Sequence, residues 1–153
     1  MRIKSLLLVL PPLLVGCMIF SSIKEDVQEE LDINRALWDG TAIDDYSMKF
    51  QRLCVFCSVD ILIPVRITVR GDTISEVMDL DTEAPVEEPA PGAFLTIDGV
   101  FKDIQDAIDQ DAMEIDVRNN STFGYHTDVT IDVSRSLFID DRQFQIREFV
   151  ELE

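Results

Sequence analysis

Residues 65–80 read VRITVRGDTISEVMDL, and this stretch decides the fold class. Apolar side chains stand at every second position from Val65 to Val69, which is typical of a strand with one buried face. Arg70-Gly71-Asp72 supplies a turn, and residues 73–80 return as a second strand. The stretch therefore predicts a β-hairpin, and its Arg-Gly-Asp is the turn of that hairpin rather than an adhesion motif.

Four further segments alternate in the same way and predict four more strands. They are Tyr46–Phe50, Met113–Val117, Val129–Val133 and Phe144–Glu151. In the last of them, the alternation places Glu148 on the same face as Phe144 and Ile146.

Two segments have apolar residues at helical spacing. Ser22-Ile23-Lys24-Glu25 has the form of a capping box, so we expect a first helix from about residue 23 to 38 that stops at Gly40. Asp98 can cap a second helix. The apolar positions of this second helix share one face, and they are Val100, Phe101, Ile104, Ala107 and Ile108.

Each half of the chain thus reads as one helix followed by three strands, with a Pro-rich loop over residues 83–92 between the halves. The length of 153 residues suits one domain, which we place at residues 23–153. Consecutive strands joined by short turns favour an antiparallel sheet. We therefore expect an α+β fold in which about six antiparallel strands carry two helices on one face and leave the other face open.

The N-terminus reads as an export signal. Residues 1–16 contain two basic residues and then an apolar run that is too short to span a bilayer comfortably. The run ends in Leu14-Val15-Gly16-Cys17, which resembles the lipobox of bacterial lipoproteins. That resemblance implies cleavage before Cys17, lipid on its sulfur and a short tether over residues 17–22. Met18 after the Cys implies the periplasmic face of the outer membrane if the host is Gram-negative. The alternative is an uncleaved amphiphilic anchor.

The charge of the chain disfavours partners that are themselves negatively charged. Removing residues 1–16 takes away two basic residues and no acidic ones, which leaves 11 Lys and Arg against 30 Asp and Glu, a formal net charge of −19. Such a surface repels nucleic acid and anionic headgroups. The acids are spread along the chain, which indicates a solvated folded surface rather than a disordered tail.

A series of short motifs runs in order from Trp38 to the end of the chain. They are Trp38, Asp45-Tyr46, Cys54 with Cys57, Pro64–Val69, Thr96–Phe101, Gly124-Tyr125 and Thr130–Asp132. Their order resembles an uncharacterised bacterial family, domain of unknown function 6174, which occurs mainly in lipoproteins and secreted proteins. His126 stands where Pro is expected after Gly-Tyr, and the cysteines are one residue further apart than in many members. The resemblance implies no activity.

Cys54-Val55-Phe56-Cys57 is the strongest chemical signal in the chain. In thiol oxidoreductases such a pair sits at a helix N-terminus, where the helix dipole lowers the pKa of the attacking thiol. Here the pair follows a predicted strand, and no basic residue is nearer than Arg52. A structural disulfide between Cys54 and Cys57 is therefore favoured over redox catalysis. A zinc site is less favoured still, because structural zinc generally takes four protein ligands.

His126 and two groups of acidic residues lack the surrounding motif that a site would need. His126, the single histidine, lies in a predicted loop near Asp128, but no nucleophile elbow accompanies it. The acids of residues 79–83 alternate without the Gly and the terminal Glu of an EF-hand, and those of the second helix (Asp103, Asp106 and Asp109) read as its solvated side. We expect no catalytic residue, no metal ligand and no cofactor.

The expected function is a non-enzymatic, membrane-tethered module that binds an envelope protein or a small ligand. A periplasmic thiol oxidoreductase using Cys54 and Cys57 is the alternative, and a divalent-cation-binding protein is a weaker one.

Overall fold

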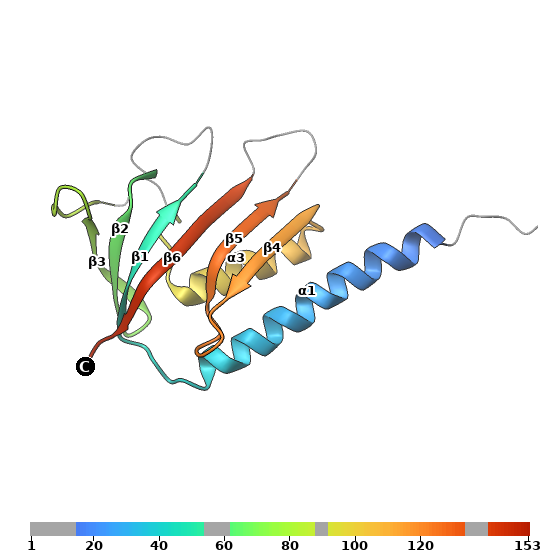
Figure 1. Ribbon diagram of the computed structural model, residues 1–153, viewed down its shortest axis with the longest axis horizontal. Helices are drawn as coiled ribbons and strands as arrows, with labels where there is room; N and C mark the ends of the chain where they lie inside the picture. The colour runs from blue at the N-terminus through green and yellow to red at the C-terminus, as the bar shows by residue number, and fades with distance from the viewer. Residues whose placement is uncertain (1–14, 54–61, 88–91, 134–140) are drawn as a thin grey trace, which may run out of the picture.

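The sheet has six antiparallel strands in the order β3-β2-β1-β6-β5-β4 (Figure 1). The computed structural model describes residues 15–53, 62–87, 92–133 and 141–153, with side chains from residue 24 onward. The strands are β1 (Tyr46–Arg52), β2 (Val65–Arg70), β3 (Thr73–Asp79), β4 (Glu114–Asn119), β5 (His126–Asp132) and β6 (Arg142–Glu151). Two long helices accompany them, α1 (Val15–Asp39) and α3 (Ile97–Asp109). The predicted α+β class is confirmed, with one helix and three strands in each half.

The two halves of the chain meet at the centre of the sheet. β1 pairs with β6, from Arg52 opposite Phe144 to Tyr46 opposite Glu151. The first strand of the first half thus lies beside the last strand of the second half. Strands that correspond in the two halves therefore occupy different places in the sheet.

Helix α1 begins at Val15, well before the expected start near residue 23. Ser22 lies inside the helix, so the predicted capping box does not start it, and the backbone of residues 17–22 is helical. Extending a helix costs less free energy than nucleating one, and no proline interrupts residues 15–22. The end near Gly40 is as predicted. Among the described residues, no helix combines the length and apolar character needed to cross a membrane.

Helix α3 is capped by Thr96 rather than by the predicted Asp98. The Thr96 side chain accepts a hydrogen bond from the N–H of Gly99, 3.0 Å away, and Asp98 falls in the first turn. Tertiary packing explains the shift, because Ile97 is fully buried and its N–H donates to the Tyr46 hydroxyl at 2.8 Å. The apolar face predicted for this helix is buried as expected.

The core lies between the helices and one face of the sheet. Ten inward-facing strand residues are at most 1% exposed, and they are Tyr46, Met48, Phe50, Val65, Ile67, Val69, Val129, Ile131, Phe144 and Ile146. At the end of α1, the ring of Trp38 makes edge contacts with Tyr46, Tyr125 and Phe149, at centroid distances of 5.6, 6.2 and 5.9 Å. This aromatic cluster ties the end of α1 to the sheet.

A β-bulge in β6 overturns the predicted orientation of Glu148. The pairing of β1 with β6 shifts register between Ser47 and Lys49, and Glu148 has a φ of 50°. The extra residue inverts the alternation beyond it, because side chains change face at every residue of a strand. Phe149 therefore packs against Trp38, and Glu148 points away from the core, where it pairs with Arg66.

Candidate functional site

The predicted cysteine chemistry lies outside the described side chains. Cys54 and Cys57 belong to residues 54–61, which the structure does not describe. The backbone of Cys17 is part of α1, and its side chain is not described. The disulfide and the lipid attachment therefore stay predictions.

The prediction that His126 lies in a loop is wrong. His126 is the first residue of β5, and its side chain is 1% exposed. Its Nδ1 lies 2.5 Å from Oδ1 of Asn119, whose Nδ2 donates to Glu30 of α1 at 2.6 Å. The ring of Phe101 packs on the imidazole at 4.7 Å. Burial lowers the pKa of His126 to about 4, so the imidazole is neutral at pH 7. The side chain thus links β4, β5 and α1 inside the fold.

The acidic segment after β3 forms a turn. Oδ1 of Asp79 accepts hydrogen bonds from the N–H groups of Asp81 at 2.7 Å and Thr82 at 3.1 Å, which lower the pKa of Asp79. This carboxylate therefore holds the backbone of the turn. In the described parts of the chain, no group of three or more His, Cys, Asp or Glu side chains could hold a metal ion.

The acids of α3 are less uniformly solvated than predicted. Asp103 is partly buried, and Oδ1 of its carboxylate accepts a hydrogen bond from Arg142 at the start of β6. Asp106 pairs with Lys102 on the helix surface at 2.5 Å. Asp103 therefore connects α3 to the sheet.

The face of the sheet turned away from α3 carries no helix in the part of the chain that the structure describes (Figure 1). We call its centre the open face, and it consists of Ser47, Lys49, Gln51, Arg66, Thr68, Gln143, Gln145, Arg147 and Glu148. Along β1, β2 and the first part of β6 the members alternate with buried core residues, and the bulge places Arg147 and Glu148 next to each other on this face. All of the members are polar or charged; Ser47 among them is buried, and Val150, paired opposite Ser47, adds an exposed apolar side chain to the same face.

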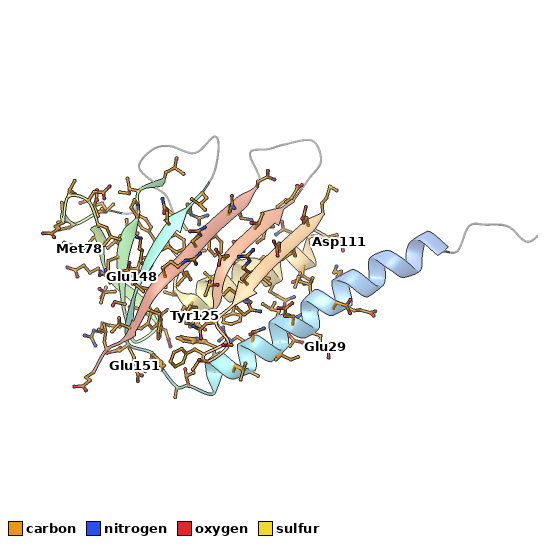
Figure 2. All side chains as sticks on the ribbon, viewed as in Figure 1. Glu29, Met78, Asp111, Tyr125, Glu148 and Glu151 are labelled. Atoms are coloured by element: carbon orange, nitrogen blue, oxygen red, sulfur yellow. The ribbon has the colours of Figure 1, made fainter. Side chains whose placement is uncertain are left out.

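Charge pairs organise the open face. The carboxylate of Glu148 lies 3.0 Å from Arg66 and 3.9 Å from Lys49 (Figure 2). Arg147 bonds Asp128 of β5 at 2.6 Å, which lowers the pKa of Asp128. These pairs place five basic and acidic side chains from neighbouring strands at fixed positions, which is what recognition of a polar partner needs. The sequence did not single out Glu148, because the bulge depends on pairing with β1.

A hollow lies where α1 ends. It has a volume of about 280 Å³ and is lined by Arg35, Trp38, Asp39, Ala42, Ile43, Asp44, Asp72 and Asp98. Arg35 already pairs with Asp39 at 2.9 Å and with Asp98 at 2.6 Å. The hollow therefore offers carboxylates but no pairing of a nucleophile with a base.

Residues 30–151 match a family described as a family of unknown function (DUF6174). The match covers the motifs from Trp38 onward that carry the resemblance seen in the sequence. No curated protein and no solved structure matches the chain.

Proposed function

The chain belongs to this family of unknown function, which assigns it no activity, and on structural grounds we propose a function. The protein is a lipid-anchored envelope module that binds a partner through its open face. The proposal rests on one observation: within the described residues, helices cover only one face of the sheet. Helix α3 packs on one face with α1 against it, and the other face presents an ordered array of polar and charged groups from four adjacent strands. Interfaces use such arrays for specificity and orientation.

The position of α1 supports the anchor. Figure 1 shows that the N-terminal end of α1 projects beyond the sheet. A lipid on Cys17 would therefore sit at the far end of the helix. The eight residues from Cys17 to Lys24 span roughly 10 Å of helix, which would hold the sheet clear of the membrane. This arrangement leaves the open face accessible to a partner.

A photo-crosslinking experiment tests the binding surface. A benzophenone amino acid is placed at Gln145 in the open face, and at the exposed Lys102 of α3, on the other side of the sheet, as a control. We expect irradiation of host membranes to give a discrete adduct from position 145 that is absent from position 102. Arg66→Glu should reduce that adduct, because it reverses a charge beside Glu148. Equal adducts from both positions, or none from 145, would contradict the proposal.

The anchor and the rival function have a test of their own. Intact mass of the membrane-derived protein should show lipid on Cys17, and Cys17→Ser should release the protein from membranes. Alkylation of Cys54 and Cys57 only after reduction would support a disulfide. Free thiols with a pKa well below about 8.5 would instead support the thiol oxidoreductase.

A further inference from the structure

The two edges of the sheet differ in how they are covered. Beyond β3, the segment 84–86 pairs with the strand, because the N–H of Val86 donates to Val77 and the N–H of Asp79 donates to Ala84. Pro85 forms a bridge with Met78 there. The order of the sheet ends at β4, and within the described ranges no segment pairs with its outer edge. An unpaired edge strand presents N–H and C=O groups that can bind another strand.

Helix α1 comes close to residues at both ends of β4. Lys24 pairs with Asp111 just before the strand at 2.5 Å, and Glu30 accepts a hydrogen bond from Asn119 at its end. Ile33 and Leu37 lie one turn apart on α1, and they are 55% and 47% exposed. These two side chains give α1 exposed apolar area that a partner can contact.

The charges around this edge select its partner. Glu114 and Asp116 are exposed on β4, and Asp26, Glu29 and Glu30 are exposed on α1. Arg118 is the single basic residue of β4. Like charges on adjacent strands oppose pairing, so these acids disfavour an acidic strand, including β4 of a second copy. They favour a strand with Lys or Arg, and the net charge of −17 attracts such a segment over a longer range.

We propose that the outer edge of β4 binds an extended cationic segment of a partner protein as an additional strand. Basic side chains of the segment lie beside Glu114 and Asp116, and apolar ones contact Ile33 and Leu37 on α1. The inference goes beyond the proposed function, because this edge is separate from the open face and its binding does not require the lipid.

A synthetic strand provides the test. The peptide acetyl-Lys-Val-Lys-Val-Lys-Val-Lys-amide is titrated into the full-length ¹⁵N-labelled chain, held in a zwitterionic detergent, and amide shifts are followed by NMR. We expect saturable shifts in β4 and slower hydrogen exchange of its outward amides. The double variant Glu114→Lys, Asp116→Lys should bind about tenfold more weakly. Ile33→Ser should also weaken binding, and both variants should keep their fold because the changed side chains are exposed.

The matched control is the double variant Glu76→Lys, Asp81→Lys, which reverses two exposed charges on and just after the opposite edge strand. It should leave the affinity unchanged. Equal binding by the Glu-Val version of the peptide, shifts centred on the open face, or an unchanged affinity in the double variant would overturn the inference. The crosslinking test at Gln145 does not involve β4, so the two proposals fail separately.

Discussion

His126 shows how the environment of one residue changes its chemistry. An unperturbed histidine has a pKa near 6.5, but burial lowers the pKa of His126 to about 4. The folded protein therefore keeps the imidazole neutral at pH values where the unfolded chain binds a proton. Stability linked to this group is complete above pH 6.5 and is lost as the pH falls towards 4.

Replacing His126 should therefore flatten part of the acid sensitivity of the protein. We expect the native chain to lose up to about 3 kcal/mol of unfolding free energy between pH 7 and 4 through this group, beyond what His126→Gln loses. Urea titrations at both pH values measure the difference. Because His126 is the single histidine, NMR of its ring protons also reports its pKa directly. An equal loss in both proteins, or a ring that titrates near 6.5, would contradict the assignment.

At the scale of elements, the turn between β4 and β5 docks the sheet onto α1. Asn120 shapes the turn, because its side chain accepts hydrogen bonds from the N–H groups of Thr122 and Phe123. Gly124 follows with a φ of 80°. A Cβ at this position would lie 2.4 Å from the carbonyl oxygen of Asn34, so the turn and the helix touch through backbone.

Gly124→Ala should consequently destabilise the protein more than a comparable glycine substitution. Gly71, in the turn from β2 to β3, also has a positive φ, but a Cβ there meets nothing within 4 Å. We expect Gly71→Ala to cost about 1–2 kcal/mol from backbone strain alone. Gly124→Ala adds a steric clash and should cost about 1–3 kcal/mol more. Urea unfolding of the two variants measures the difference, and equal costs would show that α1 moves away freely.

For the whole molecule, the excess of negative charge opposes the compact state. Thirteen basic residues face 30 acidic ones, and several of the basic ones are committed to pairs such as Arg70 with Asp45 and Arg147 with Asp128. The remaining carboxylates repel one another in the folded state, and dissolved salt screens that repulsion.

The free energy of unfolding should therefore rise as NaCl increases from about 10 mM to 0.15 M. Over this range the screening length falls from about 30 Å to about 8 Å. Trp38 is the single tryptophan and is buried, so its fluorescence reports unfolding. The midpoint of urea unfolding should move to higher concentration with salt, and equimolar sucrose serves as an uncharged control. A midpoint that falls with NaCl would show that the surface ion pairs outweigh the general repulsion.

The sequence by itself determined which residues of β1, β2 and α3 face the core. The alternation from Tyr46 to Phe50 and from Val65 to Val69, and the apolar face of α3, all appear in the structure as predicted. The family resemblance that begins at Trp38 is confirmed by the match over residues 30–151. These features depend on periodicity within one element, which a local stretch of chain encodes completely.

Only the tertiary structure decided how the elements meet. That β1 lies beside β6, with Tyr46 opposite Glu151, depends on pairing across almost the whole chain. The bulge that turns Glu148 onto the open face follows from that pairing, and so does the unpaired edge of β4. Burial of His126 requires both helices and the sheet together. Such properties arise from the free energy of the assembled sheet, in which distant segments compete for partners, and no local pattern records the outcome.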